Sequence, residues 1–301
     1  MITGRPRWVR RPSYDLGLWM LLLPFLVGAV ALVLVPAVVT AGFAFTRYDG
    51  LSPARFVGLD TYRQLFAYSE FARALKATAI FLALAVPLRV LGGLGLALLL
   101  HRRERLAVPG RVGAYLPTVL PDAATALVFL WVVNPVYGPV AVAARALDQT
   151  PGPILLDPLG ARLTIVAIAV FSLGEGFLVT LAARREVPPV LYEMARLEGA
   201  RGVGLFRRVT LPTLAPVLGL LTARDLVTSM QLVVVPVLLL TRGGPLGSTK
   251  LLPVLAYERG FRELKFGDGA AIALLLLVLT AVVVAVQYRL LRRWTRGAGV
   301  L

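Results

Sequence analysis

The chain contains no cysteine and only one histidine among its 301 residues. The missing cysteine excludes disulfides and thiolate metal sites, and it leaves the redox compartment undetermined. The single histidine, His101, lies beside Arg102 and Arg103 rather than near an acidic cluster. Because zinc sites and nucleophilic triads need several converging groups, the sequence predicts neither a metal site nor a catalytic histidine.

Charged residues are also scarce, at 16% of the chain, whereas hydrophobic residues make up 58% and the mean hydropathy is +0.79. A soluble domain is typically about 45–50% apolar and about 25% charged. This composition predicts a membrane protein before any segment is considered.

Six stretches are apolar and long enough to cross a hydrocarbon layer about 30 Å thick as helices. The first of them contains no charge and is far longer than the core of a signal peptide, so we expect a retained helix there. The sequence therefore predicts an all-α polytopic membrane protein with six spans, at about Leu16–Phe45, Ala77–Leu100, Val112–Val133, Leu163–Ala183, Leu214–Leu240 and Ala270–Leu290.

The basic residues indicate how these spans are oriented. Eighteen of the 32 lysines and arginines fall in the two tails, in the second-to-third connection and in the fourth-to-fifth connection, and twelve fall in the other loops. The positive-inside rule makes the eighteen-residue side cytoplasmic, with both termini. The net charge of +16 is thus mainly a topology signal, and we expect no nucleic-acid partner.

The cytoplasmic connection 184–216 carries a helical pattern of its own. Proline at Pro188 and Pro189 suits a helix start, and Gly199 suits a helix end. A second short helix is expected over Val203–Val209, ended by Leu211 and Pro212. The first helix is amphipathic, so the hairpin is expected to dock on a partner, although a solvated loop is the alternative.

The residues of this hairpin resemble the EAA loop of ABC-importer permeases. The pattern of that family is E-A-A, three residues, G, and then a hydrophobic-x-L-P ending; Met194 departs from it, since alanine is usual there. The resemblance implies that the loop fits a cleft of an ATPase subunit. The coupling positions that it implies are Glu193, Met194, Ala195, Gly199, Ala200, Phe206, Leu211 and Pro212.

Other stretches are similar to the sugar and glycerol-3-phosphate class of these permeases. They are Phe56–Tyr62, Trp131 to Gly138, Leu240–Pro245 and the run from Phe261 through Phe266-Gly267 to Ala271. The resemblance implies the type I importer transmembrane fold, with a tail, first helix and outer segment over 1–70, a permease core over 71–290 containing the coupling loop 184–213, and a basic tail over 291–301.

The resemblance also implies partners. An importer of this family needs ATP hydrolysis, and the chain lacks the phosphate-cradling loop that would bind ATP. Its nearest match, Gly243–Lys250, places lysine after Ser-Thr instead of after glycine. The chain is therefore expected to be no enzyme and to hold no cofactor, with ATP bound by a separate ATPase dimer. A second homologous permease, an extracytoplasmic solute-binding protein and the bilayer of the cell inner membrane complete the expected partners.

Several charged and polar residues fall inside the apolar stretches, where each is costly if it faces lipid. They predict either a polar translocation path for a hydroxyl-rich solute or structural ion pairs between helices. Arg224 and Asp225 are adjacent, so we expect them to point in different directions and to pair with other helices. An ion-coupled secondary transporter is the alternative function. The path candidates are Asp122, Glu175, Arg224, Asp225 and Gln231.

Overall fold

The computed structural model describes residues 12–101 and 107–297, and these residues are almost entirely helical. The only strands among them are β1 (Thr46–Arg47) and β2 (Arg55–Phe56), which pair antiparallel in a short hairpin. The expected all-α fold is confirmed. Several of the arginines from which the orientation was predicted lie outside the described residues, among them Arg5, Arg7, Arg10 and Arg11.

The helices follow the chain with few long connections. In order, they are α1 (Pro12–Ala29), η1 (Val30–Leu34), α2 (Val35–Phe43), α3 (Asp60–Ala67), α4 (Ser69–Leu99), α5 (Ala107–Val119), α6 (Asp122–Val132), α7 (Pro139–Ala146), η2 (Ile154–Leu156), α8 (Pro158–Phe171), α9 (Gly174–Glu186), α10 (Pro189–Leu197), α11 (Val203–Leu205), η3 (Phe206–Thr210), α12 (Leu211–Leu232), α13 (Val234–Leu240), α14 (Leu252–Tyr257), η4 (Glu258–Arg262) and α15 (Phe266–Gly297).

Four helical stretches are long and apolar enough to cross a membrane, and two bent helix pairs raise the number to six if each pair is one span. The third expected span is broken by 104° between α5 and α6. Proline disfavours helical backbone in the residue before it, which is Leu120 here. Pro121 itself has a ψ of 143° and precedes α6, so the chain turns at these two residues. The fourth is bent by 44° between α8 and α9.

The connection between the first two expected spans, 47–76, contains a short helix. It is α3, whose residues Thr61, Tyr62 and Leu65 are buried, while the tilted rings of Phe45 and Tyr62 lie 5.7 Å apart. α4 then begins at Ser69, earlier than the expected start near Ala77. The helix of the second span therefore begins about two turns before the apolar stretch, and it includes residues 69–76.

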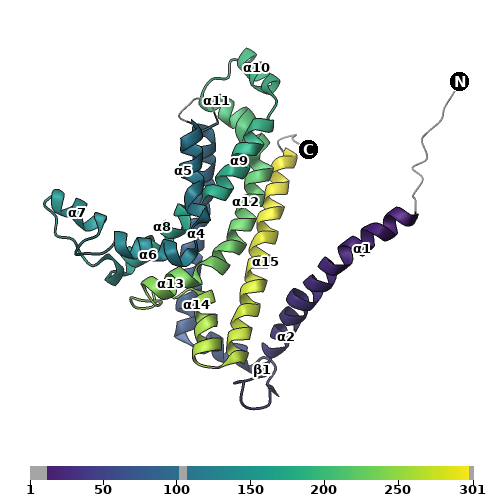
Figure 1. Cartoon of the computed structure of the whole chain (residues 1–301), viewed down its shortest axis with the longest axis vertical. Helices are drawn as coiled ribbons and strands as arrows, with labels where there is room; N and C mark the ends of the chain where they lie inside the picture. Colours follow the sequence, from purple (N-terminus) through teal and green to yellow (C-terminus); the bar gives the residue numbers. More distant parts are fainter. Residues whose placement is uncertain (1–11, 102–106, 298–301) are drawn as a thin grey trace.

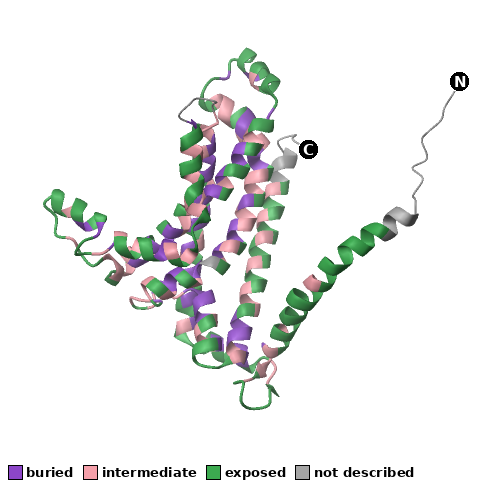
Figure 2. Cartoon of the chain, viewed as in Figure 1, coloured by how far each residue is buried: buried purple, intermediate pink, exposed green. Residues whose placement is uncertain are grey.

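The N-terminal helices stand away from the rest of the molecule (Figure 1). From Gly17 to Phe43 the most apolar window of this arm has no buried residue, and Figure 2 colours it almost wholly exposed. Only its far end touches the body, where Ala44 joins a cluster of buried residues with Leu252 and Ala271. An apolar surface of this length must be covered by lipid tails or by another protein.

α4 is the helix around which the body is packed, with α8, α9, α12 and α14 in contact with it. α4 and α9 approach closely at Gly93, where an added Cβ would lie 3.1 Å from the backbone nitrogen of Phe177. In lipid, helices associate through such close backbone contacts rather than through burial of apolar surface. An added Cβ at Gly92 would lie 3.0 Å from a side-chain carbon of Leu173, whereas Gly95 has open space around it.

Replacing Gly93 by valine should therefore weaken the α4–α9 contact and lower stability by about 1–3 kcal/mol, because the backbone of α9 cannot move away freely. Gly95→Val lies two residues further along the same helix and faces open space, so it is the matched control. The thermal unfolding midpoint of the two variants in the same detergent measures the difference. Equal midpoints would show that this contact does not support the bundle.

Candidate functional site

The predicted cytoplasmic hairpin is formed by α10, α11 and η3, and it lies at one end of the bundle (Figure 1). α10 begins with Pro189 in its first turn, where proline removes no hydrogen bond. It ends at Leu197, and two residues later Gly199 takes a φ of 82°. The predicted start and end of this helix are confirmed.

A Schellman cap explains the spacing of alanine and glycine in the hairpin. The amide of Ala200 donates to the carbonyl oxygen of Ala195 at 2.9 Å, and the amide of Gly199 donates to that of Arg196 at 3.0 Å. This pair of bonds requires a left-handed residue, and a Cβ at Gly199 would touch nothing within 4 Å. Glycine is thus needed there for its backbone conformation and not for space.

The inner side of the hairpin packs against the ends of α4 and α12. Ala195 and Ala200 are buried in one cluster with Leu94 and Leu214. The hydroxyl groups of Tyr192 and Thr210 lie 3.0 Å apart and join α10 to η3. The hairpin is therefore fixed to the bundle, so it moves with these helices rather than independently of them.

The outer side of α10 presents an apolar stripe to the surroundings. Val190, Met194 and Leu197 follow one another at helical spacing, and Met194 and Leu197 are 56% and 90% exposed. Glu193 is also exposed, beside a cavity of about 350 Å³ that includes His101 and Arg196. An exposed apolar stripe bordered by charges is typical of a protein-binding surface.

The eight predicted coupling residues thus separate into three groups. Three are exposed and available to a partner: Glu193, Met194 and Gly199. Two, Ala195 and Ala200, are buried in the cap. The remaining three are half-buried, and Phe206 faces the same cluster as the cap: they are Phe206, Leu211 and Pro212.

The expected helix end at Leu211-Pro212 is wrong. The helix that begins at Val203 continues to Gln231, and Pro212 lies in the first turn of α12. The reason is the π-helical turn η3, in which the amide of Leu211 donates to the carbonyl oxygen of Phe206. A wider turn of this kind accommodates the missing amide and the ring of a proline without ending the helix.

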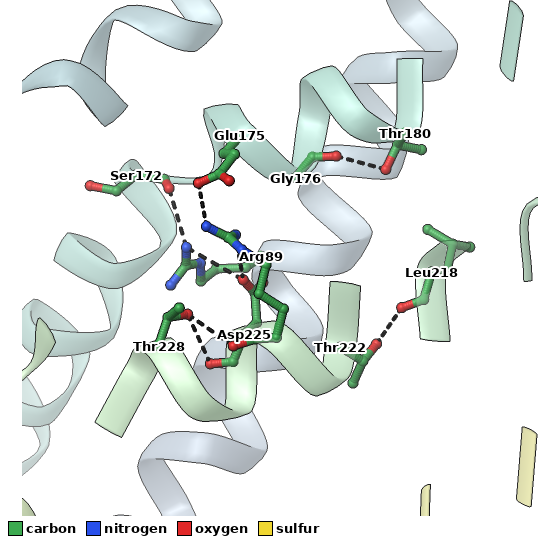
Figure 3. A network of polar contacts seen from close by, with 10 residues as sticks. Arg89, Ser172, Glu175, Gly176, Thr180, Leu218, Thr222, Asp225 and Thr228 are labelled. Atoms are coloured by element: carbon green, nitrogen blue, oxygen red, sulfur yellow. Dashed lines mark hydrogen bonds and ion pairs between the residues drawn. The ribbon is translucent and has the colours of Figure 1, made fainter. Parts of the chain in front are cut away.

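A second constellation lies between α4, α9 and α12, where Arg89 is surrounded by polar partners (Figure 3). A guanidinium nitrogen of Arg89 lies 3.6 Å from a carboxylate oxygen of Asp225 and donates to the carbonyl oxygen of Ser172 at 3.3 Å. Both charged side chains are buried. Arg224 pairs with Glu175 across α12 and α9, in a more exposed position.

The structure brings three predicted path residues together, Glu175, Arg224 and Asp225, and adds Arg89, another charged residue of the apolar stretches, for which the sequence predicts no role. Arg224 and Asp225 each find a partner on another helix, as expected. The expectation that they point apart is wrong in one respect, because the guanidinium of Arg224 also lies 3.7 Å from the carboxylate of Asp225. A long arginine side chain can bend back along its own helix.

Asp122 begins α6 and lines a small cavity of about 40 Å³ together with Arg89, Ser172 and Ser229. In the described part of the chain, Arg89 Nε and Ser229 Oγ have no hydrogen-bond partner. A cavity of this size, with unpartnered polar groups among its lining residues, has room for one or two water molecules. Gln231, the remaining path candidate, is exposed near the end of α12 and does not line this cavity.

Residues 89–296 match the family described as binding-protein-dependent transport system inner membrane component, and the chain belongs to this family. It is therefore the permease component of an ABC importer and a multi-pass membrane protein. The family consists of transport components, which agrees with the expectation that the chain is not an enzyme. It also decides against the ion-coupled secondary transporter.

Particular relatives support this assignment. The sulfoquinovosyl glycerol transport system permease protein SmoG of Agrobacterium fabrum is 29% identical over 95% of this chain and 94% of its own length. The sn-glycerol-3-phosphate permease protein UgpA of the same organism is 30% identical over 81% of this chain and 83% of its own. A bacterial alginate ABC transporter has the same fold, with a TM-score of 0.80, 21% identity and coverage of 96% and 99%.

Asp225→Ala should lower stability by about 3–5 kcal/mol, because it leaves the buried Arg89 guanidinium without a carboxylate. Glu175→Ala is the control, since its partly exposed pair with Arg224 should contribute less than about 1 kcal/mol. Adding Arg89→Leu to Asp225→Ala should restore much of the loss. Detergent-based unfolding of the four proteins tests this ranking, and a double variant less stable than Asp225→Ala alone would contradict it.

Proposed function

We propose that this permease imports a sugar or a related polar solute into the cytoplasm, driven by a dimer of separate ATPase subunits that bind the ATP. The observation that carries the ATPase contact is the exposed stripe of α10. Val190, Met194 and Leu197 are apolar, exposed and held on a rigid hairpin. Such a surface needs a partner, and a cleft on an ATPase subunit would cover it.

The solute class is supported by relatives named for the transport of sulfoquinovosyl glycerol, glycerol-3-phosphate and trehalose/maltose. Residues Glu175, Arg224 and Asp225, with Asp122 and Arg89 nearby, form a polar site between apolar helices. Carboxylates and guanidinium groups can exchange hydrogen bonds with the hydroxyls of a sugar. We assign to this cluster the wall of the translocation path, with Gln231 further along the same helix.

We further propose six spans with both termini in the cytoplasm of a cell whose inner membrane holds the protein. Two of the six spans are the bent pairs, α5 with α6 and α8 with α9. The positive-inside bias supports placing the hairpin inside and the loop between α13 and α14 outside.

A second, homologous permease and an extracytoplasmic solute-binding protein complete the proposed assembly. The unburied arm from Gly17 to Phe43 supports the first, since a partner subunit could cover apolar surface that this chain leaves open. The structurally similar alginate transporter is described in complex with a periplasmic protein. The outer loops offer the corresponding surface here.

Glu193→Ala and Gly199→Ala should each weaken the ATPase contact by about tenfold, the first by removing an exposed carboxylate and the second by straining the cap by about 1–2 kcal/mol. Matched controls are Glu186→Ala, an exposed carboxylate at the end of α9, and Gly204→Ala, which has ordinary space for a Cβ. Co-purification of the ATPase and solute uptake are measured. Intact assembly and full uptake in both variants would rule out the coupling assignment.

The absence of cysteine allows a direct test of the topology. Leu197 and Leu246 are 90% and 89% exposed, in the hairpin and in the loop after α13. The cells express this chain without an ATPase subunit, so that the stripe of α10 stays uncovered. On such intact cells, a membrane-impermeant maleimide should label Leu246→Cys but not Leu197→Cys, and permeabilised cells should label both. The parent chain without cysteine serves as the blank, and the reverse labelling pattern would contradict the proposed orientation.

A further inference from the structure

A pocket of about 430 Å³ lies between the first turns of α4 and the loop that joins α13 to α14. α4 contributes Glu70 and Arg73, and the loop contributes Arg242, Lys250 and three glycines. Its volume is within the range of small-molecule binding sites. The chain segments that line it lie away from α10 along the bundle (Figure 1), on the side that the proposed topology places outside the cytoplasm.

Two of the charged residues in this pocket neutralise each other's charge and are held by neighbours. The Lys250 ammonium lies 3.0 Å from Glu70 and 2.8 Å from Glu258, and Glu70 also pairs with Arg259 at 2.6 Å. Burial alone would lower the pKa of Lys250, but the hydrogen bonds to Glu258 and Glu70 outweigh it and raise that pKa above its usual value. This part of the wall is therefore a fixed, balanced ion-pair network.

The other two charges are not balanced. The side chains of Arg73 and Arg242 are exposed, and neither guanidinium group makes a hydrogen bond or an ion pair with the described part of the chain. The pocket therefore carries two guanidinium groups without a counter-charge. A guanidinium presents parallel N–H donors that match a carboxylate, sulfonate or phosphate, so the missing partner is an anion.

The loop holds Arg242 in a fixed and unusual conformation. Arg242 has a φ of 50°, a left-handed value that is uncommon for residues other than glycine. Its amide donates to Val237 at 2.7 Å, and the Thr249 hydroxyl donates to Gly244 at 2.7 Å. Since strained backbone persists only where its surroundings enforce it, this loop presents the arginine in advance of any ligand.

The backbone of the loop adds uncharged donors. Gly243 and Gly247 line the pocket, and their amides have no acceptor in the described part of the chain. The lack of side chains at these positions lets a ligand approach the backbone closely. The pocket thus combines two free guanidinium groups, free amides and one balanced carboxylate–ammonium pair.

We propose that this pocket binds the anionic group of an acidic sugar derivative through Arg73 and Arg242, with Glu70 and Lys250 available to its hydroxyls. The proposal rests on the function above, which makes the chain a solute importer, and it narrows the solute to an acidic one. The positive pocket would raise the local concentration of such an anion at the outer mouth of the permease.

The test uses the purified full-length chain in phosphatidylcholine nanodiscs, without ATPase or binding protein. Saturation-transfer NMR or calorimetry measures the binding of D-glucuronate and D-glucose 6-phosphate, with D-glucose as the neutral probe. Both anions should bind at least tenfold more tightly than glucose, and 0.5 M NaCl should weaken their binding by screening. Arg73→Ala/Arg242→Ala should weaken it about tenfold, whereas Arg55→Ala, an exposed arginine outside the pocket, should not.

Equal binding of glucose and glucuronate, or anion binding unchanged in the double variant, would overturn the proposal. The proposal would also be overturned if neither anion binds. In that case, stimulation of ATP hydrolysis by the binding protein is measured, to decide whether the pocket binds that protein instead of a solute. If the double variant loses stimulation of ATP hydrolysis by the binding protein, the pocket captures an acidic side chain of that partner. Because the nanodisc assay needs no ATPase, its failure is distinct from a failure of the coupling assignment.

Discussion

The ion pair between Arg89 and Asp225 is the interaction on which the middle of the bundle depends. Both side chains are almost fully buried, and a charge in that position is tolerated only with a partner of opposite sign and further hydrogen bonds. Arg89 obtains the latter from the carbonyl oxygen of Ser172, which is free of α-helical pairing because α8 ends at Phe171. Arg89 of α4 therefore joins two features of the bundle: it bonds the bend between α8 and α9 and it pairs with α12.

Close approach of α4 and α9 is the second half of this arrangement. Lipid tails are as apolar as leucine, so helices surrounded by them gain little from burying apolar surface against each other. Gly93 lets the backbones meet, and this contact brings Arg89, one turn earlier on α4, next to the α8–α9 bend. Packing and charge pairing thus act at neighbouring positions of the same two helices.

Features that depend on local sequence could be predicted, and features that depend on distant partners could not. Gly199 and the helix before it follow from capping rules that involve a few residues. The role of Arg89 depends on Ser172 and Asp225, which are far away in the sequence, and the contact of Arg224 with Asp225 depends on how a flexible side chain bends. Pro212 was expected to end a helix because proline usually does so. The π-helical turn before it, which depends on packing, leaves no clear mark in the sequence.

The uninterrupted helix from Val203 to Gln231 connects the two sites, because it begins in the hairpin and carries Arg224 and Asp225. At 1.5 Å per residue, the distance along it from Val203 to Asp225 is about 33 Å. A hydrogen-bonded helix resists compression, so it provides a continuous connection between the hairpin and the ion-pair cluster. The π-helical turn at Phe206–Thr210 is the part of the hairpin that leads into α12, and the inner face of the hairpin is packed on Leu94 and Leu214. Movement of the exposed stripe of α10 therefore requires α4 and α12 to move with it, and Arg89 and Asp225 lie on those two helices.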